Sequence, residues 1–328
     1  MQPQLTYRLF HDADLPGLLR LWEEAGWGTL TPEQWREWFI YGPQGPSLVT
    51  VATDEQGDVV AQEVFAPSRA VVGGREVGAL RVSAPILREE IRGGSLRDAA
   101  HPIFGLLKAG EAAAAARGFS VIYSLPEYGW LPVFRILPRV GIPRYGEAAY
   151  ACVSTPIDAA LAPEIERVAN GLETHSVTQF EEEYEGLWRQ AKETFPIDYG
   201  VVRDPAWLRF RNSGRITVEV REAATGRLVG YSATKKQTGL VADLLAREPG
   251  ELKCVIAATL RWLATNRSDL PAGLTHLKVM RTSALAPAVD ALGFTPTDYR
   301  FAFFCKAFDS TVPVEDVAPE RWYILPGD

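Results

Sequence analysis

Residues 118–142 (GFSVIYSLPEYGWLPVFRILPRVGI) and residues 274–294 (LTHLKVMRTSALAPAVDALGF) share one pattern. Each stretch contains a short apolar run, which is typical of a buried strand. Each then continues into an apolar segment of helical character and closes at a glycine followed by a hydrophobic residue. The pattern predicts a strand-then-helix unit that occurs twice, and a repeat this long indicates a duplicated domain.

The segments before these two stretches repeat in the same order. Residues 48–65 and 216–235 alternate apolar and polar side chains around a glycine turn, which predicts pairs of strands. A long helix follows in each copy, near residues 101–117 and 250–267, and the first of these helices is expected to end at Gly118. Each copy therefore has the order βααβββ–α–β–α–β.

This order predicts an α/β fold of two tandem modules, each a mixed, mostly antiparallel sheet flanked by helices. We place the first module at residues 1–155 and the second at residues 174–328, because the link between them carries prolines and a glycine. In the first module, Thr31 and Pro32 are predicted to begin a helix with a buried Trp35.

Composition excludes several classes of function. The chain has 328 residues, 47% hydrophobic and 23% charged, which is typical of globular domains. Its net charge of −7 argues against a nucleic-acid or membrane partner, since both need a basic face. The three cysteines lie far apart in apolar runs. The sequence has no closely spaced Cys/His pairs of the kind that bind a metal ion, so no metal site is predicted. Without a signal peptide or a long apolar span, we expect a cytoplasmic protein.

The order of elements resembles the GNAT (GCN5-related N-acetyltransferase) superfamily, and the chain is similar to bacterial proteins with two tandem GNAT-like modules. Residues 118–142 and 274–294 resemble the family's fifth strand, the helix after it and the closing Leu-Gly-Phe element, here Leu292-Gly293-Phe294. The resemblance implies transfer of an acetyl group from acetyl-CoA to the amine of a small molecule or peptide. It also implies catalysis in the first module, because the second offers only Pro249-Gly250 before its long helix.

In that family a glycine-rich loop before the long helix binds the pyrophosphate of CoA through backbone N–H groups. Two registers of this loop are open here: one around residues 92–95, the other from Arg97 to Gly105, where Pro102 has no N–H to donate. On the fourth strand, backbone groups are expected to contact the thioester. The cofactor-binding candidates are Val82, Ala84, Arg92, Gly93, Gly94, Ser95 and Arg97.

Acyl transfer to an amine needs a base for the amine's proton, and a proton donor helps the thiolate leave. Glu63 and Glu90 are the candidate bases, because the family often uses a carboxylate on or near the fourth strand. Tyr128 is the candidate acid, since the helix after the fifth strand carries no tyrosine where the family has one. Glu127 and Tyr128 are expected to line the acceptor site at the end of that strand.

Two further interpretations remain open. Loss of the loop glycines in both copies favours a catalytically inactive binding or regulatory protein of the same fold. An aminoacyl-tRNA-dependent transferase also uses paired GNAT-like domains, but the acidic net charge counts against it. His101, next to Pro102, is expected at the start of the long helix, and a homodimer is possible for this module arrangement.

Overall fold

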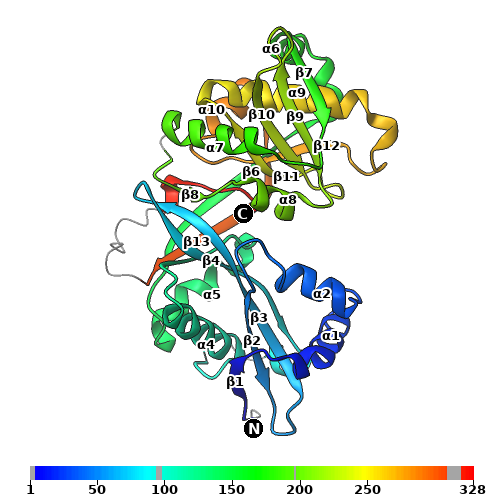
Figure 1. The fold of residues 1–328 in the computed structure, drawn as a ribbon. Coiled ribbons are helices and arrows are strands. Elements are labelled where there is room, and N and C mark those ends of the chain that lie inside the picture. The colour runs from blue at the N-terminus through cyan, green and yellow to red at the C-terminus, as the bar shows by residue number, and fades with distance from the viewer. Residues whose placement is uncertain (1–3, 94–97, 196, 309–318) are drawn as a thin grey trace. The chain divides into compact units, whose positions relative to one another are not determined.

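The computed structural model describes residues 4–93, 98–195, 197–308 and 319–328, and Figure 1 shows its ribbon. Contacts between residues divide the chain into two compact units. Unit 1 comprises Met1–Ala70, Glu76–Glu147 and Phe303–Val317, and unit 2 comprises Val71–Arg75, Ala148–Ala302 and Ala318–Asp328.

These units are interleaved along the chain, unlike the expected modules at residues 1–155 and 174–328. The difference is clearest in β13 (Thr295–Ala307), whose last residues lie in unit 1 and pair antiparallel with β5 (Val121–Ser124). We expected this strand to complete the second module. Its apolar run indicates a strand but not its partner, because pairing depends on residues distant in sequence.

Unit 1 is built on a sheet with the order β1-β2-β3-β4-β5, followed by the end of β13. Its other strands are β1 (Thr6–Leu9), β2 (Leu48–Thr53), β3 (Val59–Val72) and β4 (Arg75–Leu87), and β6 (Gly146–Pro156) begins at its boundary. Its helices are α1 (Leu15–Glu24), α2 (Pro32–Phe39), α3 (Glu89–Arg92), α4 (Pro102–Ala116) and α5 (Leu131–Ile136), with 3-10 turns at Asp12–Asp14, Tyr128–Trp130 and Leu137–Val140. The pairs β1–β2, β2–β3 and β5–β13 are antiparallel and β4–β5 is parallel, which confirms the predicted mixed, mostly antiparallel sheet.

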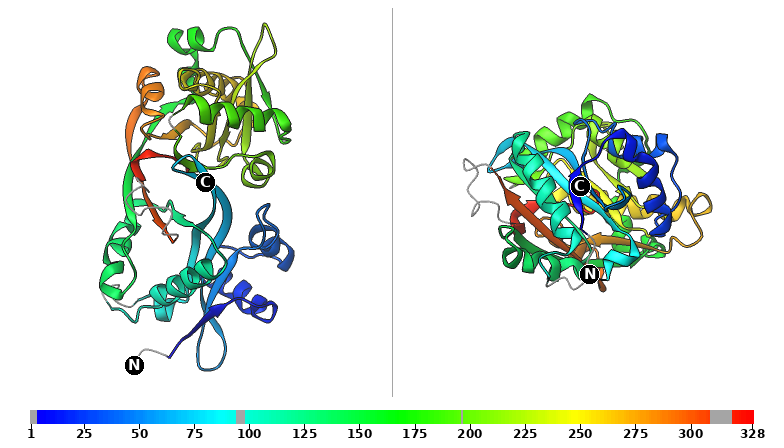
Figure 2. Two further views of the ribbon diagram at one scale, coloured as in Figure 1. Left: turned by 60° about the vertical axis from the view of Figure 1, so that its left-hand side comes forward. Right: turned by 90° about the horizontal axis from the view of Figure 1, so that it is seen from below.

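The helices α1 and α2 cover one face of this sheet (Figure 1; Figure 2). As predicted, Thr31 caps α2: its hydroxyl accepts the N–H of Gln34 at 3.2 Å, and the Gln34 side chain accepts the N–H of Thr31 at 2.9 Å. Trp35 is completely buried in the core between the helices and the sheet. This core fixes which side chains of β2 and β3 face α1.

The helix α4 covers the opposite face, where two glycines allow it to approach closely. A Cβ on Gly105 would lie 2.3 Å from the ring of Tyr7, and one on Gly110 would lie 2.0 Å from the ring of Phe65. Phe65 therefore points toward α4. Because side chains alternate along a strand, Glu63 points to the same face.

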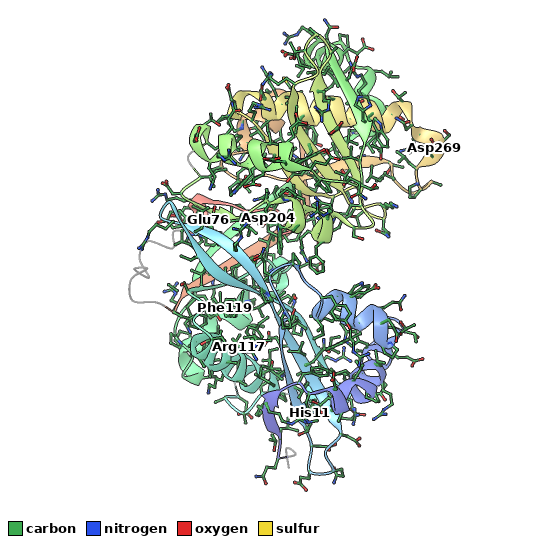
Figure 3. All side chains as sticks on the ribbon, viewed as in Figure 1. His11, Glu76, Arg117, Phe119, Asp204 and Asp269 are labelled. Atoms are coloured by element: carbon green, nitrogen blue, oxygen red, sulfur yellow. The ribbon has the colours of Figure 1, made fainter. Side chains whose placement is uncertain are left out.

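The end of α4 follows the prediction from Gly118. This residue has φ +76°, a left-handed conformation that a glycine adopts at little cost. The N–H of Phe119 bonds to the carbonyl of Ala114 at 3.2 Å. Arg117 and Phe119, the neighbours of Gly118 in the chain, are labelled in Figure 3. The chain thereby turns from the helix into β5.

Unit 2 has its own sheet, in the order β11-β10-β9-β7, with antiparallel neighbours throughout. Its strands are β7 (Leu172–Ser176), β8 (Tyr199–Val201), β9 (Ile216–Glu222), β10 (Leu228–Thr234), β11 (Val241–Ala246), β12 (His276–Met280) and β14 (Trp322–Tyr323). Its helices are α6 (Pro163–Ala169), α7 (Glu182–Thr194), α8 (Pro205–Asn212), α9 (Leu252–Thr265) and α10 (Ala286–Ala291), with 3-10 turns at Ile157–Leu161, Pro249–Glu251, Arg267–Asp269 and Pro319–Arg321. The apolar α9 packs on this sheet and forms the centre of the unit's core.

A buried arginine links the last residues of the chain to the rest of unit 2. Arg203 is completely buried, and its guanidinium donates to Asp243 at 2.8 Å and to Asp328 at 2.6 Å. It also lies over the ring of Tyr323, at 5.0 Å from its centroid. Such a pair of carboxylates stabilises a cation that would otherwise be costly to bury.

Candidate functional site

The parallel strands β4 and β5 separate within unit 1. Their register runs from Ala79↔Val121 to Arg81↔Tyr123, and beyond it the hydroxyl of Ser124 donates to the carbonyl of Val82 at 3.1 Å. β4 continues to Leu87 past this point. The separation opens a gap in the sheet between the end of β4 and the residues that follow β5.

Ala84 bends β4 at this gap. It has φ +51° and is, in the described residues, the only non-glycine with positive φ. Such a conformation costs about 1–2 kcal/mol for an alanine and marks a local change of backbone direction. The side chain of Gln62 donates to the Ala84 carbonyl at 3.3 Å and so supports the bend from β3.

An inner cavity of about 250 Å³ lies at the gap. Its walls are mainly apolar side chains from α4, from α5 and the turns beside it, and from the loop after α1. They are Trp27, Ile103, Phe104, Leu107, Leu125, Trp130, Val133, Phe134 and Leu137. Residues 81–85 of β4 and the polar residues Glu63, Ser124 and Glu127 complete the lining.

Glu63 is a buried polar residue of this cavity. Its residue is 4% exposed, and its Oε2 atom has no hydrogen-bond partner in the described part of the chain. Burial, and to a smaller extent the negative charge of Glu111, raise the pKa of Glu63 to about 8. The carboxyl group is therefore mostly protonated at neutral pH.

Glu111 belongs to a buried polar cluster behind Glu63. Its two carboxylate oxygens accept hydrogen bonds from the Tyr145 hydroxyl and from the Lys306 ammonium group, each at 2.6 Å. Lys306 comes from the part of β13 that lies in unit 1. The cluster satisfies Glu111, and Glu63 is the buried carboxyl group that lines the cavity.

An outer cavity of about 550 Å³ adjoins the inner one. Both share Trp27, Pro85, Ile103, Glu127, Trp130 and Val133 as lining residues. The outer cavity extends along the end of β4 to Arg92 and His101 at the start of α4. Together the two cavities form one cleft, which runs from Arg92 and His101 to Glu63.

The first N–H groups of α4 are already bonded within the helix. His101 is the N-cap, and its Nδ1 accepts the N–H of Ile103 at 3.3 Å, which confirms its expected place at the helix start. Pro102 has no N–H, and the N–H of Phe104 bonds to the His101 carbonyl at 3.0 Å. An anion at this helix end would therefore meet side chains before it met unpaired backbone donors.

The candidate residues from the sequence fall into four groups. Glu63, Val82, Ala84 and Glu127 line the inner cavity, and Glu127 and Arg92 line the outer one. Glu90 and Gly93 instead line a separate hollow of about 980 Å³ on the β1 side of α4. Tyr128 is 39% exposed and lines neither cavity of the cleft. Gly94, Ser95 and Arg97 lie outside the described residues.

The cleft also contains residues that were not singled out from the sequence, among them Trp27, Trp130 and Ser124. Trp27 follows α1 in a loop, and Trp130 comes two residues after the expected Tyr128, so neither shows a helical or strand period that marks it as buried or exposed. In the described residues, no group of three or more His, Cys, Asp or Glu side chains is placed to hold a metal ion.

No protein-family model matches the sequence, and no curated protein matches it either. Solved structures, however, share its fold. A GCN5-related N-acetyltransferase from Anabaena variabilis matches with a TM-score of 0.62 and 14% identity, over 93% of this chain and 73% of that one. A tandem GNAT protein from the clavulanic acid biosynthesis pathway matches with a TM-score of 0.56 and 14% identity, over 93% and 98% of the two chains.

Saccharomyces cerevisiae N-myristoyltransferase with bound myristoyl-CoA is a third match, with a TM-score of 0.59 and 10% identity over 93% of this chain and 78% of that one. These likenesses confirm the GNAT fold that the sequence predicted. In the described parts of the chain, no helix is both long and apolar enough to cross a bilayer.

Proposed function

We propose that unit 1 is an acyl-CoA-dependent N-acyltransferase, which transfers an acyl group from the thioester to an amine. The observation that supports this most directly is the end of the β4–β5 pairing after Arg81↔Tyr123, because the residues beyond it line a continuous cleft. The shared fold with acyltransferases supports the same assignment.

The cleft offers a suitable group for each part of the donor. Arg92 lies at its outer end beside His101, and its guanidinium would meet the phosphates of CoA. Pro85, Ile86 and Leu87 line the outer cavity and would flank the pantetheine arm. The apolar inner cavity would receive the acyl group, and the backbone around the bent Ala84 would meet the thioester carbonyl.

The acceptor amine would enter where Glu127 lies with Trp27 and Trp130, which all line both cavities. Aromatic faces and a carboxylate together favour an amine with an apolar body. In the reaction the amine nitrogen attacks the thioester carbon, a C–N bond forms, and the C–S bond breaks. Glu127 accepts the proton that the amine loses and returns it to solvent, while the thiolate of CoA leaves and takes up a proton through the same solvent, so that no net proton is gained or lost.

The hydrogen bonding at the start of α4 favours a second function, ligand binding without acyl transfer. Because its first N–H groups are bonded within the helix, the phosphates would be held mainly by side chains. A protein of this fold that binds a ligand without acyl transfer would also explain that feature. The amine acceptor distinguishes the two functions, since only a transferase releases free thiol from acetyl-CoA when an amine is added.

Calorimetric titration of the full chain with CoA and acetyl-CoA tests whether the cleft binds the donor. We expect Arg92→Ala to weaken binding by roughly tenfold, because a charge-assisted contact is lost. Arg139→Ala is the matched control, since Arg139 is exposed in unit 1 and lines neither cavity. If both variants lost the same affinity for CoA, the total charge of the protein, and not a contact with Arg92, would account for the binding.

Gly129 gives a way to block the cleft. It lines the outer cavity, and a Cβ added there meets nothing within 4 Å. Gly129→Trp should abolish binding of acetyl-CoA by filling the cavity, whereas Gly129→Ala should not. Thiol release with a panel of amines then measures transfer, and we expect Glu127→Gln to slow it by roughly a hundredfold. Absence of CoA binding to the wild-type chain would overturn the proposal.

A further inference from the structure

The inner cavity contains a polar group that transfer of a plain acetyl group leaves unused. Glu63 lies on the face of β3 that α4 covers, and Gln62, beside it, faces α1 through its bond from Trp22 at 3.0 Å. The carboxyl group therefore sits on the α4 side, among the side chains of Phe104 and Leu107. In the described residues its Oε2 has no hydrogen-bond partner, although Glu63 is only 4% exposed.

Two polar groups near Glu63, those of Glu111 and Ser124, are already engaged with others. Glu111 accepts from Tyr145 and Lys306, and the hydroxyl of Ser124 donates to the Val82 carbonyl. A buried polar group without a partner costs roughly 1–3 kcal/mol, so its presence in a mainly apolar cavity indicates a partner that enters from outside. The cavity wall nearest to α4 is where that partner would lie.

We infer that Glu63 is a specificity-determining residue of the acyl cavity, which takes an acyl chain bearing a hydroxyl group that hydrogen-bonds to the Glu63 carboxyl. The inference rests on the proposed function, because it assigns the inner cavity to the acyl group. A hydroxyl group can both donate and accept, so it suits a carboxyl group in either protonation state.

The size of the cavity agrees with a short acyl chain. Its 250 Å³ is roughly eight times the volume of one water molecule in the liquid, which suits a chain of a few carbons. A plain chain of that length would fill the apolar part and leave Glu63 unpaired. Sites built to bind a hydroxyl group discriminate against the analogue without it for this reason.

The charge of the carboxyl group also favours a neutral partner. The pKa of Glu63 is raised to about 8 by burial and by Glu111, so at pH 7 the group is mainly the neutral acid. Lys306 is bonded to Glu111, and Arg81, which also lines the cavity, has an interaction of its own. A neutral hydroxyl group adds no new charge to this buried environment, whereas a cationic or anionic acyl chain would.

The test compares three CoA thioesters of equal chain length: butyryl-CoA, 3-hydroxybutyryl-CoA and 4-hydroxybutyryl-CoA. Calorimetry on the wild-type chain at pH 7 gives the three dissociation constants, with CoA itself as the reference. We expect one of the hydroxyacyl thioesters to bind roughly tenfold more tightly than butyryl-CoA. Two positions of the hydroxyl group are tested so that it is offered at two distances from the thioester.

Two variants assign the preference to Glu63. Glu63→Leu should abolish or reverse it, because an apolar wall favours the plain chain. Glu63→Gln keeps a hydrogen-bonding side chain, so this variant should retain most of the preference for the hydroxyacyl thioester. It also provides the test if Glu63→Leu does not fold. Equal binding of all three thioesters by the wild type would overturn the inference and assign a bound water as the partner of Glu63, with the proposed function intact. Failure of CoA and every thioester to bind would overturn the proposed function itself.

Discussion

The indole N–H of Trp22 donates to the side-chain oxygen of Gln62 at 3.0 Å, and the same amide group donates through its nitrogen to the carbonyl of Ala84 at 3.3 Å. These bonds connect α1 through β3 to the bend in β4. Ala84 is held in its left-handed conformation beside the cleft partly by this connection, since Gln62 is completely buried and cannot exchange it for water.

Trp22→Phe should therefore destabilise unit 1 by about 1–3 kcal/mol, because it leaves the Gln62 oxygen buried without a donor. Urea unfolding followed by circular dichroism measures the change. Trp38→Phe is the control: Trp38 is 52% exposed, so its variant should stay within about 0.5 kcal/mol of the wild type. Equal effects of the two substitutions would show that lost aromatic area, not the hydrogen bond, determines the cost.

The side of β3 that carries Glu63 could be predicted from alternation alone, and the sequence placed this residue among the candidates. Its lack of a partner could not be predicted, because that depends on Glu111 being bonded to Lys306, which is 195 residues away. The bend at Ala84 is equally hidden, since alanine shows no preference for positive φ. Local sequence patterns predicted the helices and strands, but the chemistry of the site depends on contacts between residues that are distant in sequence.

The start of α4 is a second place where the sequence predicted the position of a residue but not its contacts. The sequence placed His101 at the helix start, and the structure confirms it as the N-cap. Neither open register of the phosphate loop predicted that the ring of His101 would bond to the N–H of Ile103. An N-cap is usually Ser, Thr, Asp or Asn, so a histidine in this role carries little signal in sequence.

Stability should depend on pH through Glu63. Its pKa is about 8 in the folded chain, against 4.5 as the ordinary value, so the folded state binds the extra proton between these pH values. Stabilisation by the neutral form is fully present below pH 4.5 and is lost as pH rises through 8. Across this window the wild type should lose about 1.4 kcal/mol per pH unit relative to Glu63→Gln.

Urea unfolding of both proteins at several values from pH 5 to pH 9 measures this difference directly, because all other titrating groups are shared. A difference that stays constant with pH would mean that the folded carboxyl group titrates near its ordinary value. In that case Glu63 would be charged at neutral pH, and water would have to reach it.

His101 should produce the opposite trend at acid pH. Burial lowers its pKa below the ordinary 6.5, so the folded state keeps the imidazole neutral while the unfolded chain takes up a proton. Its stabilisation is present above pH 6.5 and is lost as pH falls through the folded pKa. His101→Asn, which keeps an N-cap acceptor, should remove this loss, and His101→Ala should cost about 1 kcal/mol even at pH 7.5.

Unfolding free energies at pH 7.5 and 5.5 test these expectations, and His175→Asn serves as the control because the His175 side chain is 54% exposed. The difference in unfolding free energy between the wild type and His101→Asn should become smaller or change sign when the pH falls from 7.5 to 5.5. If the difference in unfolding free energy did not change with pH, N-capping of α4 by His101 would not depend on a neutral imidazole.

The bond between Lys306 and Glu111 gives the last prediction, because it joins the end of β13 to α4 inside unit 1. Lys306→Met should destabilise the protein by about 3–5 kcal/mol, since it leaves the Glu111 carboxylate buried with only Tyr145 as a donor. The double variant Glu111→Gln, Lys306→Met should recover much of this loss, because no charge is then left unpaired.

Lys108→Met, an exposed position on α4, is the matched control and should change stability by less than about 0.5 kcal/mol. A double-mutant cycle from urea unfolding gives the coupling between Lys306 and Glu111. If the double variant were as unstable as the sum of the single ones, the two groups would act independently. The end of β13 would then hold to unit 1 through its backbone pairing with β5 and its apolar contacts alone.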